Sequence, residues 1–217
     1  MPEICRILGV SIGPGGLPKS PQGGQVLLSV EGFANDKHRY RLHGGPDKAV
    51  CVYCEDDYLE LEDQGCKPPN DDEWSIGAFG ENLTIDGIRS QRVRLGSCFF
   101  TGTVVMQVTQ PRQPCNNLNV YGPRMRKTLE QQLRTGFYMK VLQGGALQAG
   151  EELYYENLRG MTIEQVNHLF YVQMRSGSPQ QRRAAAETLL ATENLSEDFK
   201  TLVHKSRIMS LDQGASN

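Results

Sequence analysis

The chain has 217 residues, and its 23 Lys and Arg against 25 Asp and Glu give a formal net charge of -2. This length suits one good-sized core, or a core domain with a small appendage. A content of 38% apolar and 22% charged residues is typical of a soluble globular protein. Because the charge is nearly balanced, a nucleic acid polymer is not expected as a partner.

The N-terminal segment predicts neither a signal peptide nor a membrane anchor. No basic stretch leads into a long apolar run, and Gly13-Pro14-Gly15-Gly16 interrupts the run from Ile7 to Ile12. No segment approaches the roughly 20 apolar residues of a spanning helix. The sequence therefore predicts a cytoplasmic protein without membrane contact, whose six cysteines are reduced thiols.

Residues 4–155 have the sequence pattern of a β domain, with short strand-like runs separated by glycine-rich turns. Apolar residues alternate at the two-residue period of a half-buried strand in Thr103–Thr109 and Phe137–Gln143, and Gln25–Glu31 is a further strand candidate. Helical spacing is expected at Asp56–Asp63 and at Arg124–Arg134. This region is predicted to be mainly β with a few interspersed helices.

Beyond about residue 160, three short helices are predicted, each opened by a serine or threonine. Thr162 with Gln165, and Ser178 with Gln181, fit a capping box, and Ser196 precedes two acidic residues of a first turn. Each helix has an apolar stripe that could pack in a small bundle. We therefore expect a β domain over residues 1–158, a C-terminal three-helix domain over 159–211 and a flexible tail over 212–217.

Three segments carry polar residues that folding alone does not require. In the first, His43-Gly44-Gly45 would let backbone amides approach an anion, with Lys37, His38 and Lys48 as neutralising cations. The second is Phe79-Gly80-Glu81-Asn82-Leu83. Taken singly, the first is also compatible with a plain turn, and the second with a hairpin turn or a structural asparagine.

The third segment, Gln110-Pro111-Arg112-Gln113-Pro114-Cys115, places a thiol on a loop stiffened by two prolines. Such a thiol could be a nucleophile or a metal ligand, and the cation of Arg112 would favour its thiolate. The alternative is a small buried hydrophobe, the usual fate of a free cysteine.

The remaining cysteines and histidines fit structural roles better. Cys51 and Cys54 have redox-motif spacing, but the acidic residues that follow disfavour thiolates and a strand would point the two side chains apart. Cys66 and Cys98 lack the spacing of a zinc site. Exposure or ordinary packing is expected for His168 and His204.

Taken together and in this order, these segments, with Gly136-Phe137-Tyr138-Met139-Lys140-Val141, resemble the MOSC domain family, named for the C-terminal domain of molybdenum cofactor sulfurase. The likeness is closer still to its bacterial YiiM branch, which adds a C-terminal three-helix domain. The resemblance covers nearly the whole chain and implies a β-barrel-like fold. The family usually has glycine before Asp36 where this chain has Asn35, a residue that tolerates positive φ.

The resemblance also implies a chemistry: a molybdenum cofactor whose metal is coordinated by Cys115. A soft thiolate suits molybdenum already held by dithiolene sulfurs. Gly44 and Gly45, with Lys37, His43 and Arg112, could hold the phosphate and pterin, and Asn82 offers a donor and an acceptor to the pterin edge.

The activity implied by the YiiM branch is reduction of N-hydroxylated compounds, notably hydroxylaminopurines, by oxygen-atom transfer. This would protect cells against mutagenic base analogues. Because no dinucleotide fingerprint or iron-sulfur pattern is visible, electrons are expected from a separate reductase, with a flavoprotein as the candidate. The helices could dock that reductase or a second subunit of a homodimer, or simply stabilise the barrel. An alternative function is a cofactor or sulfur carrier that binds at Cys115 without turnover.

Overall fold

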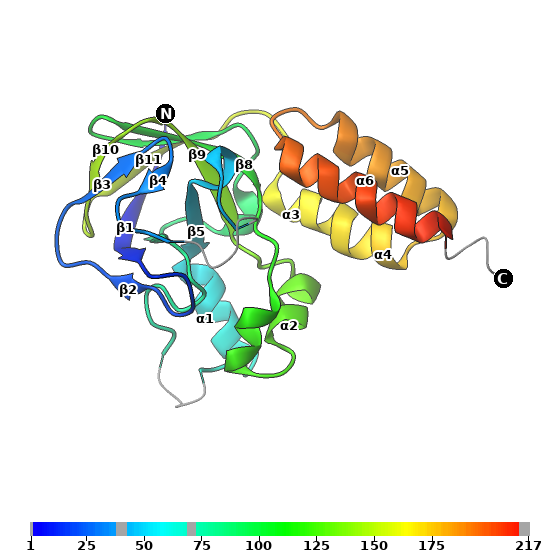
Figure 1. Ribbon diagram of the computed structural model, residues 1–217, viewed down its shortest axis with the longest axis horizontal. Coiled ribbons are helices and arrows are strands. Elements are labelled where there is room, and N and C mark those ends of the chain that lie inside the picture. Colours follow the sequence, from blue (N-terminus) through cyan, green and yellow to red (C-terminus); the bar gives the residue numbers. More distant parts are fainter. Residues whose placement is uncertain (1, 38–42, 69–72, 213–217) are drawn as a thin grey trace.

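A computed structural model describes residues 2–37, 43–68 and 73–212, with side chains to residue 206. Within these ranges, seven strands close into a mixed β-barrel, to one side of which a helical unit is attached (Figure 1). The barrel strands are β1 (Glu3–Ile12), β5 (Val50–Cys54), β6 (Leu83–Asp86), β7 (Cys98–Thr101), β8 (Val104–Pro111), β9 (Phe137–Gln143) and β11 (Glu152–Glu156).

The barrel closes because β1 pairs on one side with β6 and on the other with β11, so the order runs β1-β11-β7-β8-β9-β5-β6 and returns to β1. Closure pairs the edge strands of the sheet with each other. Strands β5 and β6 pair in parallel, whereas the other neighbours in the barrel are antiparallel. A parallel pair needs a crossover connection, and helix α1 (Glu55–Asp63) lies on it.

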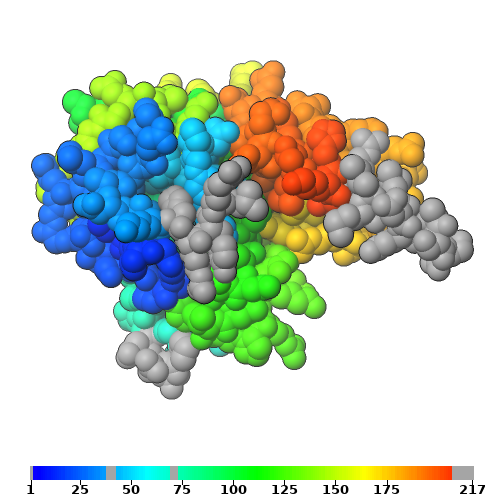
Figure 2. Space-filling model, in the orientation of Figure 1, coloured from blue at the N-terminus to red at the C-terminus, as the bar shows by residue number. Residues whose placement is uncertain are grey.

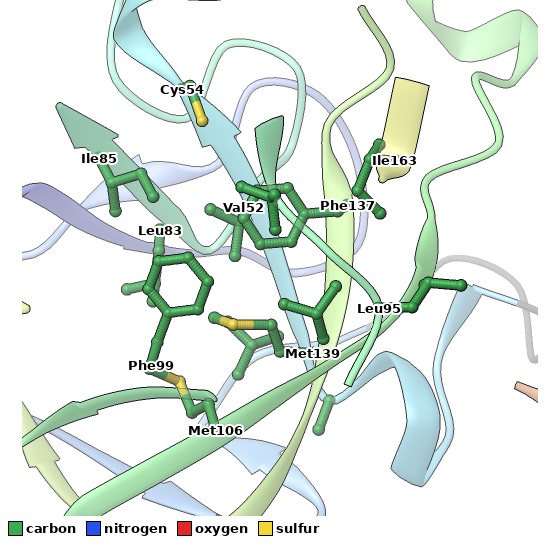
Figure 3. Packing of buried hydrophobic residues seen from close by; sticks show 14 of the residues in the cluster. Val52, Cys54, Leu83, Ile85, Leu95, Phe99, Met106, Phe137, Met139 and Ile163 are labelled. Atoms are coloured by element: carbon green, nitrogen blue, oxygen red, sulfur yellow. The ribbon is translucent and has the colours of Figure 1, made fainter. Parts of the chain in front are cut away.

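Alternating side chains fill the barrel interior. Met106 and Val108 on β8, and Phe137 and Met139 on β9, are fully buried, which confirms the predicted inward faces of both strands. Phe99 stacks on Tyr155 with ring centroids 4.6 Å apart. Figure 3 shows Phe99 and Met106 packed beside Leu83 and Met139 in this core.

Smaller elements surround the barrel. A three-stranded sheet is formed by β3 (Val26–Ser29), β4 (Gly32–Phe33) and β10 (Gly145–Leu147), while β2 (Ser20–Pro21) pairs with the end of β1. Among the described residues, the connections also contain the 3-10 turns η2 (Pro46–Lys48), η3 (Ser90–Arg92) and η4 (Asn116–Tyr121), and helix α2 (Met125–Gln132). The predicted helices at Asp56–Asp63 and Arg124–Arg134 therefore exist, the second two residues shorter at its end.

The C-terminal helices begin where the sequence predicts them. The first runs as α3 (Ile163–Asn167), a π-helical segment η5 (His168–Gln173) and α4 (Met174–Ser176), and is followed by α5 (Pro179–Ala191) and α6 (Glu197–Asp212). Both predicted capping boxes, at Thr162 and Ser178, are present. Asp212 still belongs to α6, and residues 213–217 of the expected tail lie outside the described residues.

The helical unit shares one continuous hydrophobic core with the barrel. Buried Asn167 donates from Nδ2 to the carbonyl of Leu133 at 3.2 Å and to the hydroxyl of Thr135 at 2.9 Å. Ile163 donates its backbone N–H to the carbonyl of Val93 at 2.8 Å. None of the helices described is both long enough and apolar enough to span a bilayer.

Candidate functional site

A basic pocket lies on the outer side of strands β5 and β9, against Cys51 and Tyr138, where four loop segments far apart in the sequence converge. The segments are the β1–β2 loop, the region around η2, the turn at 77–82 and the loop that follows β8. The free space, including its open mouth, is about 620 Å³. Its lining residues are Gly15, Gly16, Leu17, Lys19, Lys37, His43, Lys48, Cys51, Phe79, Gly80, Asn82, Arg112, Gln113, Cys115, Asn117 and Tyr138.

Cys115 reaches this pocket from the end of the proline-flanked loop. Its backbone is extended, with φ -109 and ψ 168, and it caps η4, whose Leu118 donates its N–H to the Cys115 carbonyl at 3.1 Å. The side chain is half-buried, whereas Pro111 and Pro114 beside it are buried. The predicted thiol therefore lies at the pocket surface and not among aliphatic side chains.

Arg112 is the deepest cation of the pocket, with only 6% of its surface exposed. Nη2 donates to the carbonyl of Phe79, but Nη1 is buried and has no hydrogen-bond partner. Burial lowers the pKa of this guanidinium, but Cys51, Tyr138 and Glu81, each negative when ionised, outweigh burial and raise the pKa overall. A buried N–H donor without a partner is costly, so Nη1 marks a position for an acceptor from a ligand.

Further cations line the same pocket in a chain whose net charge is -2. Lys19 and Lys48 are both 8% exposed, and Lys37 and His43 also line the wall. Lys19 forms an ion pair of 2.7 Å with Asp36, and Lys48 forms one of 2.8 Å with Asp198 of α6. Such a concentration of positive charge in a concave surface favours an anionic ligand.

Asp36 and Asn82 tie the walls of the pocket together. Asp36 accepts from the Gly13 backbone N–H at 3.0 Å and from Asn82 Nδ2 at 2.8 Å. Asn82 Nδ2 also donates to the Ser11 carbonyl at 3.2 Å, and its Oδ1 accepts from the Cys51 N–H at 3.1 Å. Since both amide N–H donors of Asn82 are used within the protein, this residue supports the wall rather than offering donors to a ligand.

Glu81 holds the turn that carries Phe79 and Gly80. Its fully buried carboxylate accepts from the backbone N–H groups of Gly77 at 2.9 Å and Phe79 at 3.1 Å. The hydroxyls of Tyr58 and Thr84 donate to the same carboxylate. These bonds explain why the segment predicted from sequence needs a glutamate, although Glu81 itself does not line the pocket.

The pocket has a second thiol, Cys51. Cys51 and Cys54 lie on opposite faces of β5, as predicted: Cys51 lines the pocket, and Cys54 is in the barrel core. Burial raises the pKa of the Cys51 thiol, and Arg112 and Lys19 oppose that effect. Burial, followed by Cys51, raises the pKa of Tyr138, which keeps its hydroxyl protonated at neutral pH.

The structure thus brings together most, but not all, of the site residues predicted from sequence. Lys37, His43, Asn82, Arg112 and Cys115 line one pocket. Gly44 and Gly45 lie in the same loop but do not line it; Gly45, at φ 113, instead turns the chain into η2, which carries Lys48. His38 lies outside the described residues.

Sequence reasoning missed part of the pocket. Gly15, Gly16 and Lys19 come from the β1–β2 loop, and their one signal was the glycine cluster at 13–16. Cys51 is predicted from sequence to be a structural cysteine despite its redox-motif spacing, and Tyr138 is part of the segment Gly136–Val141 but is given no role in the site. In the described residues, no group of three or more His, Cys, Asp or Glu could hold a metal ion.

Comparison with known proteins places this pocket in a family. The model of the MOSC domain matches residues 39–154, more than half of the chain. The chain belongs to the MOSC domain family. It is 34% identical over 197 residues to YflK of Bacillus subtilis (strain 168), an alignment that covers 88% of this chain and 84% of YflK.

Two further similar proteins bear on fold and function. The crystal structure of YiiM from Geobacillus stearothermophilus superposes with a TM-score of 0.75 at 27% identity, covering 94% of this chain and 99% of that one. A protein named Reductase from Gibberella moniliformis (strain M3125 / FGSC 7600) is 33% identical over 138 residues, or 62% of this chain but 24% of its own length. These matches confirm the predicted barrel and the C-terminal helices, and MOSC membership supports a function related to the molybdenum cofactor.

Proposed function

We propose that this MOSC protein is a molybdenum-cofactor-dependent oxidoreductase that reduces N-hydroxylated compounds, with hydroxylaminopurines and related hydroxylamines as its substrate class. The observation that carries the proposal is the pairing of a half-buried thiol, Cys115, with the unpartnered buried Nη1 of Arg112 in one basic pocket. One group suits a soft metal and the other suits an anion.

The residues present fit a cofactor that ends in a phosphate and carries a metal on sulfur ligands. Arg112, Lys19 and Lys48 would hold its anionic end, with Lys37 and His43 nearer the rim. Cys115 would supply a protein thiolate to the metal. When bound, such a cofactor supplies the two-electron redox chemistry that side chains lack, whereas the protein supplies orientation and electrostatics.

The protein groups around the thiol have defined tasks in this proposal. Arg112 lies close enough to Cys115 for their charges to interact, so it stabilises negative charge in the pocket. Tyr138 keeps its proton at neutral pH because burial raises its pKa, and it can donate a hydrogen bond to a polar substrate group. Asp36 and Asn82 fix the wall on which Lys19 lies.

A redox role also agrees with the fungal relative that bears the name Reductase, although this chain matches only 24% of that protein. We propose that electrons reach the pocket from a separate reductase, for which a flavoprotein is the candidate. A cytoplasmic location, and a homodimer as one assembly, belong to the same proposal.

The decisive experiment replaces the proposed metal ligand. Cys115→Ser and Cys115→Ala should keep the fold but lose at least about 100-fold in dithionite-driven reduction of a hydroxylaminopurine, because the metal would lose its protein thiolate ligand. Cys98→Ser, also at a half-buried thiol but outside the pocket, is the control and should remain active. Full activity in either Cys115 variant would contradict the proposal.

Metal analysis separates this activity from the alternative of a cofactor or sulfur carrier. Protein made in a host with working cofactor synthesis should contain about one molybdenum atom per chain, as expected for a single cofactor pocket. Molybdenum without turnover would favour a carrier. Protein without molybdenum would contradict the enzyme proposal and favour the alternative of a sulfur carrier at Cys115.

A further inference from the structure

We infer that the first turn of α6, Ser196–Asp198, is a positioning element of the pocket, although it lies about 80 residues beyond Cys115 in the sequence. The inference rests on the proposed function for its biological meaning but not for its test. Figure 2 shows the orange surface of the helical unit lying directly against the cyan surface of the barrel.

The first contact runs from Ser196 to the loop that ends in Cys115. Ser196 is 6% exposed, and its hydroxyl donates to Oε1 of Gln110, the fully buried penultimate residue of β8. Nε2 of Gln110 in turn donates to Oε1 of Gln113 at 3.0 Å, and Gln113 lines the pocket. A chain of hydrogen bonds therefore connects α6 to the middle of the Cys115 loop.

The backbone strengthens this connection. The Ser196 N–H donates to the carbonyl of Thr109 at 3.1 Å, and the Thr109 hydroxyl donates to the carbonyl of Asp47 at 2.6 Å. Asp47 lies in η2, next to pocket residue Lys48. One serine is thus bonded to β8 through both its hydroxyl and its backbone, and β8 is bonded to η2.

The second contact runs from Asp198 to Lys48. Its Oδ2 is 2.8 Å from Nζ of Lys48, and the exposed fractions of the two side chains are 61% and 8%. Neighbouring Glu197 is 85% exposed in its side chain and pairs with Lys200 of its own helix at 3.1 Å. Of these two adjacent acidic residues, Asp198 pairs with a lysine of the pocket, whereas Glu197 pairs with a lysine of its own helix.

The two N-cap serines of the unit, Ser196 and Ser178, provide a matched pair of variants. Ser196 caps α6 by accepting from the Phe199 N–H at 3.1 Å, and Ser178 caps α5 by accepting from the Gln181 N–H at 3.3 Å. Replacing either serine by alanine removes a cap worth about 1 kcal/mol. Ser196→Ala alone would also leave the buried Gln110 Oε1 without its donor.

The test measures alkylation rates of individual cysteines by mass spectrometry, with the full-length chain made in a host without molybdenum cofactor synthesis. In Ser196→Ala, Cys115 should be alkylated at least threefold faster than in wild type, because the loop that ends in Cys115 is less restrained. Cys66 and Cys98, half-buried thiols outside the pocket, should keep their rates. Ser178→Ala should leave the alkylation rate of Cys115 unchanged. Ser196→Thr, which keeps a hydroxyl at this position, should show the wild-type rate.

A second arm reads the lysine contact through acetylation. In Asp198→Asn, Lys48 should be acetylated at least threefold faster than in wild type, because its ammonium group loses the paired carboxylate. In Glu197→Gln, the acetylation rate of Lys48 should equal that of wild type. Equal rates in Asp198→Asn and Glu197→Gln, or equal Cys115 labelling in the two serine variants, would overturn the inference.

Two complications are covered by the design. If Ser196→Ala opened the whole fold, the buried Cys5 and Cys54 would label rapidly, and the Asp198→Asn arm would then decide alone. Because neither arm needs molybdenum, a failure of positioning is distinguishable from a failure of the proposed function, which metal analysis reports.

Discussion

Asp57 shows at the scale of one residue how burial sets the pH dependence of this fold. It is fully buried in the first turn of α1, and its Oδ1 accepts from Arg134 Nη1 at 3.1 Å. Burial raises its pKa to about 6, and nearby Ser90 and the charge of Arg134 offset only part of that rise. The folded state therefore holds a proton that the unfolded chain releases near pH 4.

This difference has a defined sign. A raised carboxyl pKa contributes stability that is complete below about pH 4 and is lost as the pH rises through about 6. A carboxyl pKa that rises from about 4 in the unfolded chain to about 6 in the folded state corresponds to a stability difference of about 3 kcal/mol. We predict that Asp57→Asn, which mimics the protonated acid, does not lose stability in this way. Between pH 4 and 7, its free energy of unfolding should therefore rise relative to that of wild type by up to about 3 kcal/mol.

Urea unfolding at several pH values would measure the Asp57 effect as the difference between the two proteins. Asp56→Asn, at a half-buried neighbour in the same turn, is the control and should follow the wild-type pH profile. Parallel profiles for Asp57→Asn and wild type would contradict the prediction.

At the scale of elements, the turn at 77–82 meets the β1–β2 loop at Gly77. Its carbonyl accepts from the Lys19 N–H at 2.9 Å, and its φ is +82. A Cβ there would lie 2.5 Å from the Lys19 carbonyl oxygen and 2.8 Å from Ser11 Oγ. Gly77 is therefore required both for its backbone conformation and for the close approach of two pocket walls.

Gly65 shares the positive φ of Gly77 but not its close contacts, so comparing the two residues separates backbone strain from crowding. Its φ of +78 is nearly the same, but a Cβ would meet nothing within 4 Å. We predict that Gly65→Ala costs about 1 kcal/mol of unfolding free energy, from backbone strain alone, and that Gly77→Ala costs about 2 kcal/mol more, from overpacking. Equal losses in denaturant unfolding would show that the two walls separate freely.

The elements that could be predicted from sequence are those with local signals. β8 and β9 carry buried apolar residues at every second position over most of their length, and the helices at Thr162 and Ser178 begin with complete capping boxes. Asn35, which stands where the family usually has glycine, adopts φ +64 as its chemistry allows. The π-helical segment at His168–Gln173 had no such signal, because wide turns depend on packing.

The pocket was predictable to the extent that its residues lie in motifs. Arg112 and Cys115 share one loop, whereas Lys19 comes from a loop with no chemical motif and enters through its pairing with Asp36. Closure of the barrel followed from family resemblance and not from periodicity, since strand pairing across 148 residues, as between Cys5 and Leu153, leaves no local trace. Tertiary contacts decide such features.

For the whole molecule, the shared core predicts that the barrel and the helical unit unfold together. Leu95 donates its N–H to the Met161 carbonyl at 3.0 Å, and Val166 and Phe199 are buried in the same cluster as the barrel residues. Removing the helices would expose this apolar surface at roughly 25 cal/mol per Å².

We therefore expect a chain ending at Leu158 to be much less stable than the full chain, by several kcal/mol, and prone to aggregation. Calorimetry should show a single transition for the full chain. Two separate transitions, or a truncated chain with an unchanged midpoint, would mean that the barrel folds independently and that the helices are a detachable domain.

Strand β5 has one further consequence. Because Cys51 faces the pocket while Cys54 faces the barrel core, the five residues of β5 form the boundary between the ligand pocket and the hydrophobic core. Natural variation at the two thiols should then be uncoupled: changes at Cys51 would retune what the protein recognises, and changes at Cys54 would alter how well it survives heat. The same few peptide units can thus evolve toward a new ligand on one side without disturbing the architecture on the other.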